Sequence, residues 1–212
     1  MIEVTQIRKS YGKKKVLSDI TFQVKPGECV AIAGKNGCGK STLMAGILKP
    51  DGGELCYFGK KAAYKSSTFR RFCGYVPQEN PLMEELTVQD NLKLWGGSHN
   101  ANTKELVAQF QLEDLLQTEV SKLSGGMKRR LSIACALVEN PPFLLMDEPT
   151  TALDLYYKES IHQWMKTYQQ KNGIILMTTH DESEIRNADR CLFMDEGKVQ
   201  ELDAEDILQK FA

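Results

Sequence analysis

The segment GKNGCGKST, residues 34–42, constrains the fold of this 212-residue chain more than any other feature. It matches the pattern G-x-x-x-x-G-K-[ST]. A stretch that favours a strand, CVAIA, precedes it, and a stretch that favours a helix, STLMAGIL, overlaps its end. A strand, a glycine-rich turn and a helix in this order form a loop that binds phosphate. The chain is therefore predicted to contain an α/β core built around such a loop.

The residue types in this loop suit the phosphates of a nucleotide. Glycines let successive backbone N–H groups turn toward phosphate oxygens, and the helix N-terminus adds its positive end. Lys40 would bring a full positive charge to the outer phosphates, and the Ser41 hydroxyl would ligate Mg²⁺. The predicted nucleotide-binding residues of this segment are Gly34, Asn36, Gly37, Cys38, Gly39, Lys40, Ser41 and Thr42.

A second apolar stretch, FLLM, ends in two acids, Asp147 and Glu148. Carboxylates at the end of a buried strand are unfavourable unless a cation or a water molecule needs them. Asp147 is predicted to hold the hydrated Mg²⁺, and Glu148 to act as general base on a water in line with the γ-phosphate. Taken alone, the two acids could instead cap the next helix. Beside a phosphate-binding loop we favour the catalytic interpretation.

A third segment, KLSGGMKRRLSIACALVENPP at residues 122–142, has the pattern of an amphipathic helix with Ser124 as its N-cap. Gly125 and Gly126 then occupy the first turn, where each costs about 1 kcal/mol of helix propensity relative to alanine. A helix N-terminus with a hydroxyl cap and no side chains to block approach is itself suited to an anion. These residues are therefore a second candidate phosphate site.

The order of the predicted elements defines the fold class. Short strands fill the first third of the chain, helices follow after CGYVPQ, and strands then alternate with helices from FLLMDEP to the C-terminus. The predicted helices include TKELVAQFQLEDLLQ, from Thr103 to Gln117, and a long helix from about Leu153 to Lys171. Such alternation predicts a parallel sheet covered on both faces. We predict an α/β fold: a P-loop NTPase core with a mainly parallel sheet, an N-terminal antiparallel β subdomain and an inserted α-helical subdomain. The chain would be a single domain, 1–212, in which 1–78 and 141–212 form the core with its β subdomain and 79–140 form the helical insertion.

Composition and charge exclude several classes of protein. With 27 Lys and Arg against 28 Asp and Glu, electrostatics gives no support to a nucleic-acid partner. The apolar stretches are far shorter than the roughly 18 residues of a membrane-spanning helix. The N-terminus, MIEVTQIRKS, has the alternation of a strand and not the pattern of a signal peptide. The six cysteines contain no C-x-x-C pair, which indicates free thiols in a cytoplasmic protein.

Together these segments resemble one family, the ATP-binding subunits of ABC transporters. GKNGCGKST resembles their Walker A motif, FLLMDEPTTALD their Walker B motif with the D-loop, and LSGGM their LSGGQ signature. The likeness runs over nearly the whole chain in the family's order. It implies ATP and Mg²⁺ as cofactors, ATP hydrolysis, and a separate transmembrane permease subunit at the inner face of the cell membrane. Short length and the lack of a C-terminal regulatory extension hint at an exporter.

The resemblance also implies roles for residues outside the three motifs. Tyr11 falls where the family stacks an aromatic ring on adenine. Gln78 matches the Q-loop, whose amide reaches Mg²⁺ and the attacking water while the loop faces the permease. His180 matches the H-loop and would hydrogen-bond the γ-phosphate. Asp154 matches the D-loop, which crosses the dimer interface beside Glu148. On the residues alone, Gln78 could belong to a turn and His180 could be structural.

The two predicted phosphate sites can meet in either of two ways. Within one chain, the helical insertion would have to fold onto its own loop; between two chains, a two-fold dimer gives two composite sites at once. The resemblance favours the dimer, a homodimer or pseudo-symmetric heterodimer, with ATP between one chain's loop and Ser124, Gly125 and Gly126 of the other. ATP binding would close the dimer and hydrolysis would open it.

Three positions depart from the family's pattern. Met127 stands where Gln is usual, Cys135 where Arg is common, and Leu155 where Pro often follows the D-loop. Met127 cannot hydrogen-bond across the interface as Gln does, so we expect the dimer affinity or the turnover rate to differ from the family's.

Two other functions are alternatives to a transporter subunit. One is a soluble ABC-type ATPase, which usually has paired cassettes or a coiled-coil insertion. The other is a regulatory module without turnover, against which Glu148 and His180 argue. A kinase or GTPase would leave LSGGM unexplained.

Overall fold

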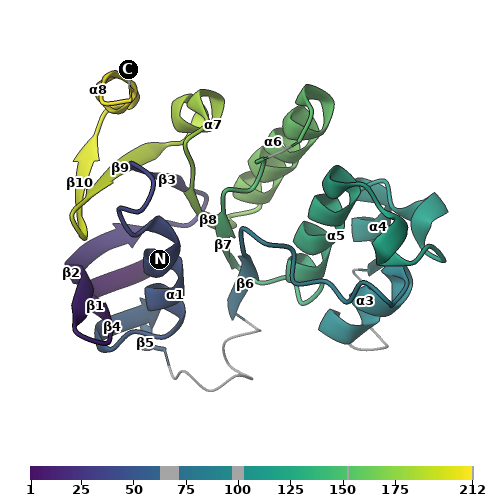
Figure 1. Ribbon diagram of the computed structural model, residues 1–212, viewed down its shortest axis with the longest axis horizontal. Coiled ribbons are helices and arrows are strands. Elements are labelled where there is room, and N and C mark those ends of the chain that lie inside the picture. Colours follow the sequence, from purple (N-terminus) through teal and green to yellow (C-terminus); the bar gives the residue numbers. More distant parts are fainter. Residues whose placement is uncertain (63–71, 97–102, 152, 212) are drawn as a thin grey trace.

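The computed structural model describes residues 1–62, 72–96, 103–151 and 153–211 (Figure 1). Its larger sheet has the strand order β10-β9-β3-β8-β7-β6. Neighbouring strands are parallel except for β9 and β10, as the alternation of strands and helices predicts. The strands are β3 (Cys29–Ala33), β6 (Cys73–Val76), β7 (Phe143–Asp147), β8 (Ile174–Thr178), β9 (Arg190–Asp195) and β10 (Lys198–Leu202).

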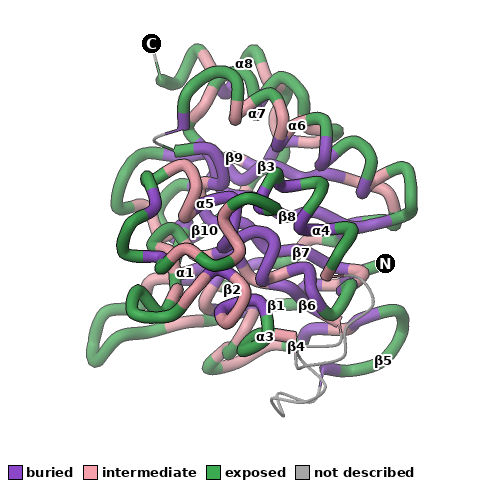
Figure 2. The backbone as a smooth tube through the Cα atoms, turned by 90° about the vertical axis from the view of Figure 1, so that its right-hand side faces the viewer, coloured by how far each residue is buried: buried purple, intermediate pink, exposed green. Residues whose placement is uncertain are grey.

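The central strands are continuous apolar runs because both faces of the sheet are covered. Every residue of β3, β7 and β8 is buried. Figure 2 shows this buried backbone in the interior, with exposed segments around it. The strand β10, which the sequence analysis did not name, is a half-exposed edge strand with the sequence KVQEL. Its polar residues gave no strand signal.

The smaller sheet is antiparallel and has the order β2-β1-β4-β5. Its strands are β1 (Ile2–Tyr11), β2 (Lys14–Val24), β4 (Gly52–Tyr57) and β5 (Lys60–Lys61). Helix α1 (Lys40–Leu48) packs between this sheet and the larger one, and residues such as Leu43 and Ile47 join a single core cluster with both. The phosphate-binding loop is thus anchored to a helix that is held on two sides.

The helical insertion lies beside β6, on the far side of the molecule from the antiparallel sheet (Figure 1). It contains α3 (Val88–Gly96), α4 (Thr103–Gln109), 3₁₀ turns at Glu113–Leu115 and Val120–Lys122, and α5 (Gly125–Leu137). The predicted helical stretch from Thr103 to Gln117 ends early, because Gln111 adopts a left-handed φ of 52°. No Gly or Pro marks this break in the sequence.

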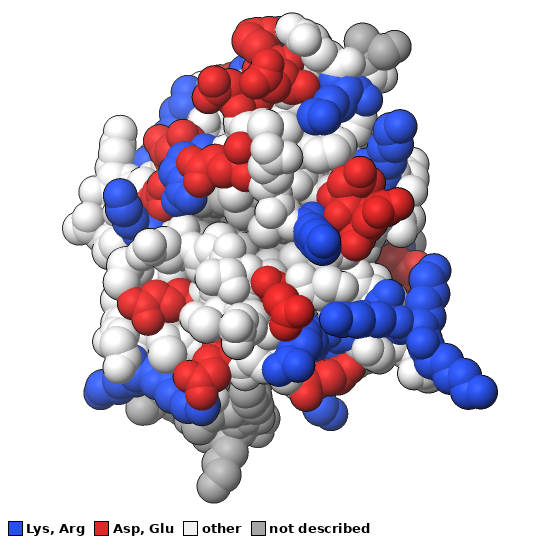
Figure 3. Space-filling model, turned by 90° about the vertical axis from the view of Figure 1, so that its left-hand side faces the viewer, with Lys and Arg blue, Asp and Glu red and all other residues white. Residues whose placement is uncertain are grey.

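The remaining helices are α6 (Leu155–Gln170), α7 (Glu182–Asn187) and α8 (Ala204–Gln209). The sequence predicted that α6 begins near Leu153; it begins at Leu155 because the Asp154 carboxylate accepts the N–H of Tyr157 at 3.1 Å and forms the N-cap. In the part of the chain that is described, no helix is both long and apolar enough to cross a membrane. Acidic and basic side chains are interspersed over the face shown in Figure 3.

Candidate functional site

An open cleft of about 570 Å³ lies at the carboxyl ends of the central strands. Its volume is in the range of a small-molecule site. The loop and α1 line it with Asn36, Gly37, Gly39, Lys40, Ser41 and Thr42. The other described lining residues are Tyr11, Lys14, Val16, Gln78, Glu148 and His180. The fold therefore brings together predicted residues from segments that are distant in sequence, and it adds Lys14 and Val16, which were not predicted.

The backbone of the loop requires glycine at three of its positions. Gly37 has a φ of 79° and Gly39, the N-cap of α1, has a φ of 112°, conformations that L side chains rarely adopt. A Cβ on Gly34 would lie 2.4 Å from the carbonyl oxygen of Met194 and 2.8 Å from Cys38 Sγ. Gly34 and half-buried Cys38 thus form the packed base of the loop, below the residues that line the cleft.

Lys40 is folded over the inside of this loop. Its side chain is 6% exposed, and Nζ donates hydrogen bonds to the carbonyl oxygens of Gly34 at 2.8 Å and Lys35 at 3.4 Å. The ammonium group is therefore held against the backbone carbonyls at the start of the loop. Ser41 follows in the first turn of α1 and is exposed to the cleft.

Three side chains surround the carboxylate of Glu148, which lines the cleft. Gln78 Nε2 and Thr151 Oγ1 donate to its Oε2 at 3.3 Å and 3.2 Å, and His180 Nδ1 lies 3.3 Å from its Oε1. Its backbone has a φ of 49°, a strained conformation for a residue with a side chain, which costs about 1–3 kcal/mol. Strain of this kind is common where a side chain is aimed at a reaction.

Asp147 lies just behind Glu148 and is 3% exposed. Thr178 at the end of β8 holds both acids in place: its hydroxyl donates to Asp147 Oδ1 and accepts the N–H of Glu148 at 3.1 Å. Glu148 lines the cleft, whereas Asp147, predicted to hold Mg²⁺, is buried behind it and is not among the described lining residues.

Glu184 is a buried acid that the sequence analysis missed. It is 2% exposed, and it accepts hydrogen bonds from the hydroxyls of Thr150, at 2.8 Å, and Thr179. Thr150 follows Glu148 by two residues and Thr179 directly precedes His180, so Glu184 ties the loop after β7 and the loop after β8 to α7. In the sequence it looks like an ordinary acidic residue in the first turn of a helix.

The loop that carries His180 is also fixed from α6. Asp181 caps α7 by accepting the N–H groups of Ser183 at 2.9 Å and Glu184 at 3.3 Å, and Lys158 Nζ lies 2.7 Å from its Oδ2. Burial alone would raise the pKa of Asp181, but the hydrogen bonds from Lys158 and Ser183 lower this pKa well below its usual range. Asp181 is therefore a charged anchor next to His180.

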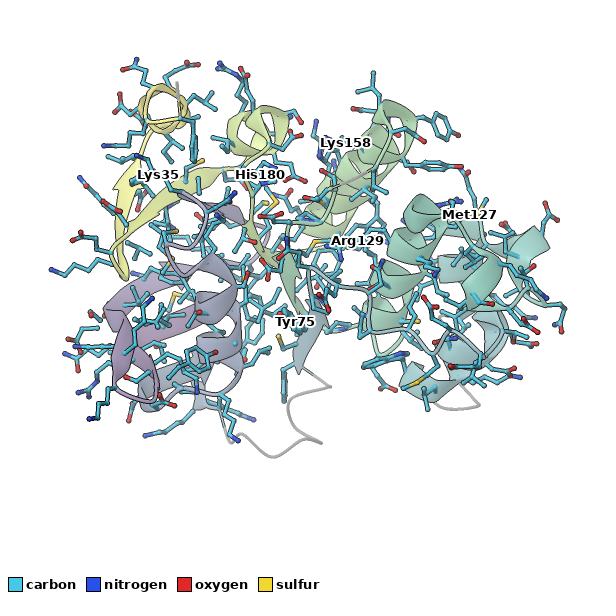
Figure 4. The ribbon with its side chains drawn as sticks, in the orientation of Figure 1. Lys35, Tyr75, Met127, Arg129, Lys158 and His180 are labelled. Carbon is cyan, nitrogen blue, oxygen red and sulfur yellow. The ribbon has the colours of Figure 1, made fainter. Side chains whose placement is uncertain are left out.

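The second candidate phosphate site lies apart from the cleft, whose described lining does not include Ser124, Gly125 or Gly126. Ser124 Oγ accepts the N–H of Met127 at 3.3 Å and caps α5. A Cβ on Gly125 would meet nothing within 4 Å among the described residues, and one on Gly126 would approach Leu153 Cδ2 at 3.4 Å. Figure 4 shows Met127 well separated from Lys35 and His180. Packing within the chain therefore does not explain Gly125.

Comparison with known proteins decides the family. A family model described as ABC transporter matches residues 17–151. The chain belongs to the ABC transporter family. It is 36% identical over 209 residues to the Nod factor export ATP-binding protein I of Rhizobium etli, which covers 93% of this chain and 66% of that protein. The chain thus spans about two thirds of the length of this ABC relative.

The fold of the chain is similar to solved ABC cassettes. An ATP-binding subunit of an ABC transporter has a TM-score of 0.88 at 32% identity, covering 100% of this chain and 93% of the other. A dimeric cassette in a post-hydrolysis state, bound to ADP and phosphate, has a TM-score of 0.86 at 29% identity, covering 96% and 99%. The predicted fold class and family resemblance are both confirmed.

The positions that depart from the ABC pattern have different surroundings. Met127 is half-buried against the helical core. Cys135 is 6% exposed, and burial raises its pKa to about 12, so its thiol is a packing group. Leu155 is 84% exposed directly after Asp154, the predicted D-loop residue. Ala152, in the same predicted loop, lies outside the described residues.

Proposed function

We propose that the chain is the ATP-hydrolysing subunit of an ABC transporter that exports its substrate. The observation that carries this proposal is the cleft in which Lys40, Gln78, Glu148 and His180 meet. Family membership and likeness to a cassette that holds ADP and phosphate support ATP as the nucleotide. The reaction is the transfer of the γ-phosphoryl group to water.

Binding would begin at the phosphate-binding loop. The amides of the loop and of the N-terminus of α1 receive the phosphate oxygens. Lys40 then exchanges its hydrogen bond to the Gly34 carbonyl for one to an outer phosphate. Tyr11, which is 56% exposed at the rim of the cleft, presents a ring on which adenine can stack.

Ser41, Gln78 and Asp147 offer side-chain oxygens, which suit Mg²⁺ because this ion prefers oxygen ligands and keeps several waters. In the described ranges, no cluster of three or more His, Cys, Asp or Glu residues could hold a metal ion. Mg²⁺ would therefore be held by Ser41, Gln78 and Asp147 together with phosphate oxygens and water, and it would neutralise charge on the phosphates.

Glu148 would take the proton from the attacking water. A general base must lie within hydrogen-bonding reach of the proton that it accepts, and the Glu148 carboxylate faces the cleft beside the loop. Gln78 and His180, each 3.3 Å from a carboxylate oxygen of Glu148, can then orient the water and the γ-phosphate.

A second chain would complete the site. Ser124, Gly125, Gly126 and Asp154 lie outside the cleft of their own chain, and Gly125 has open space around it. Likeness to a dimeric cassette supports a dimer in which these residues face the ATP of the partner chain. The dimer would be a homodimer or a pseudo-symmetric heterodimer with another cassette.

The helical insertion offers a surface for a membrane permease. Met83, Leu86, Leu94 and Trp95 are 48%, 38%, 54% and 37% exposed, and they follow Gln78 closely in the chain. Exposed apolar side chains on one subdomain would suit contact with another protein. We place the chain in the cytoplasm, peripheral at the inner face of the membrane. The export named for its relatives supports the direction of transport.

The Glu148→Gln variant tests the proposed mechanism. With Mg-ATP it should accumulate as a dimer in gel filtration, because ATP binds and closes the dimer but no base is present for hydrolysis. The wild-type chain should release phosphate under the same conditions. A variant that stays monomeric at saturating Mg-ATP would contradict the ATP-bound dimer, and copurification with ribosomes or DNA in place of a polytopic membrane protein would contradict the transport role.

A further inference from the structure

Arg129 is a buried cation that no motif in the sequence singled out. It lies in the second turn of α5 and is 4% exposed. Figure 4 shows it between α5 and the ends of the central strands. Burial lowers the pKa of its guanidinium to about 10, and the nearby Asp147 carboxylate opposes this effect. The side chain remains charged at neutral pH, so its N–H groups need strong acceptors.

All of the acceptors that the described residues provide are backbone carbonyls just after β6 and at or just after the end of β7. Nε donates to Pro149 O at 2.9 Å, and Nη2 donates to Asp147 O at 2.8 Å and Glu148 O at 2.9 Å. Nη1 donates to Pro77 O and, at 3.4 Å, to Gln78 O. One planar guanidinium therefore joins the loop after β6 to the loop after β7.

These carbonyls lie where ordinary sheet pairing stops. Strands β6 and β7 are paired as far as Val76 and Met146. Pro77 follows and has no N–H to continue the ladder. Beyond this point the side chains of Gln78 and Glu148 must meet at the cleft, and Arg129 holds the backbone of both. The N–H groups of Arg129 therefore connect the two backbones just beyond the last residues at which β6 and β7 are paired.

The position of Arg129 on α5 gives this contact a second consequence. Gly125 and Arg129 are four residues apart, which places them one turn apart on the same helix. A shift of the α5 N-terminus therefore moves the guanidinium and, with it, the two loops.

We propose that Arg129 is a positioning residue that couples the signature end of α5 to Gln78 and Glu148. The arrival of the partner chain's ATP at Ser124–Gly126 would be transmitted through α5 to the general base. This inference rests on the proposed function and adds a route by which one nucleotide site senses the other.

The neighbouring Arg130 provides a matched control. It is also 4% exposed, but Nη1 donates to Phe110 O at 2.9 Å and Gln111 O at 3.3 Å, and the guanidinium lies 4.3 Å from the Tyr157 ring centroid. These contacts hold α5 to the turn after α4 and to α6, and they do not reach the loops after β6 and β7. Replacing either arginine by lysine keeps the charge and removes the planar fork.

The test compares Arg129→Lys with Arg130→Lys in ATPase kinetics, in nucleotide binding to the monomer and in thermal unfolding. For Arg129→Lys we expect kcat to fall on the order of a hundredfold, since small misplacements of a base have effects of this size. KM for ATP and the Kd of the monomer should change little, and the fall in Tm should match that of Arg130→Lys. A kcat that falls equally in both variants, or in neither, would overturn the proposal.

A second measurement covers the case in which Arg129→Lys does not fold. In the Glu148→Gln protein, hydrogen exchange is followed before and after ATP-driven dimerisation. Amides at 78 and 147–148 should gain protection together with those at 124–128; protection confined to 124–128 would contradict the coupling. If Glu148→Gln forms no dimer and the wild-type chain hydrolyses no ATP, the proposed function itself has failed, whatever the arginine variants do.

Discussion

The N-termini of α1 and α5 are both helix ends suited to phosphate, but they are built in opposite ways. At α1 the cap is Gly39, which has no side chain to occupy the free amides, and Lys40 adds a full charge inside the loop. At α5 the Ser124 hydroxyl already accepts one amide. Two basic residues flank that end of α5, and both are paired with acids: Lys122 with Glu119 at 3.1 Å and Lys128 with Glu84 at 2.6 Å. Only the α1 end combines open amides with an available cation.

This difference indicates an order of events. A helix end alone contributes only about half a positive charge. Together with Lys40 and the loop amides, the α1 end can hold a nucleotide by itself. From the α5 end we expect only added hydrogen bonds, to phosphates that another chain already holds. ATP would therefore bind each chain first, and dimerisation would follow.

The largest expected effect comes from disabling the α1 end. Lys40→Ala should lower both ATP affinity and turnover by about a hundredfold or more, because the buried ammonium group of the loop is removed. Binding is measured by titration of a fluorescent ATP analogue, and turnover by phosphate release. Lys35→Ala is the control, since that side chain is exposed and only its carbonyl contacts Lys40. Normal ATP binding by Lys40→Ala would show that the α1 end does not hold the phosphates.

A substitution at the α5 end should change the stability of the fold and the turnover of ATP in opposite directions. Gly125→Ala places a methyl group in open space, so the free energy of unfolding should rise by up to about 1 kcal/mol through better helix propensity. The same methyl should obstruct the partner's phosphate and lower turnover about tenfold or more. Urea unfolding without nucleotide and phosphate release measure the two effects.

The control for Gly125→Ala is the affinity of the monomer for ATP, which should not change. Gly126→Ala, whose methyl would meet Leu153, should gain less stability. If Gly125→Ala keeps full ATPase activity, the α5 end does not approach a phosphate closely.

The N-terminus of α7 differs from those of α1 and α5, because the anion that it binds is a carboxylate of the same chain, Asp181. Asp181 caps α7, and its pKa is lowered in the folded state. Its contribution to stability should therefore be fully present above the pKa of the unfolded chain and be lost as pH falls through the folded pKa. In urea unfolding, Asp181→Asn should be less stable than wild type at neutral pH, and the gap should close in acid. A gap that is constant with pH would rule out the charge as its cause.

The smallest effect is expected at Met127. Restoring the family's glutamine with Met127→Gln would add a side chain able to hydrogen-bond across the dimer, so turnover should change by only about threefold, as for a single exposed hydrogen bond. ATP binding to the monomer is the control and should be equal. A turnover equal to wild type would mean that this departure has no effect on the α5 end.

The fold and the α1 end were predictable because their signals are local. A glycine-rich segment between a strand and a helix specifies its own conformation, and the alternation of strands and helices specifies a parallel sheet. Where no local signal exists, the prediction failed. Gln111 does not mark the end of α4 at Gln109, and the polar sequence KVQEL does not mark the strand β10.

The support of the site was not predictable from the sequence. Arg129 contacts carbonyls that are up to 52 residues away, and Glu184 contacts Thr150, which is 34 residues away. Both act through partners that become neighbours only in the folded chain. In sequence, Arg129 belongs to the run KRR, which is typical of a solvated helix face, and no pattern distinguishes it from Arg130.

The left-handed backbone of Glu148 has a consequence for directed evolution. Glycine adopts a φ near 49° without the strain that a side chain brings. Glu148→Gly would therefore relieve part of the backbone strain energy, which is about 1–3 kcal/mol. The same change removes the proposed base. A mutant library selected for heat resistance alone would therefore enrich glycine at this position and accumulate proteins that bind ATP without consuming it.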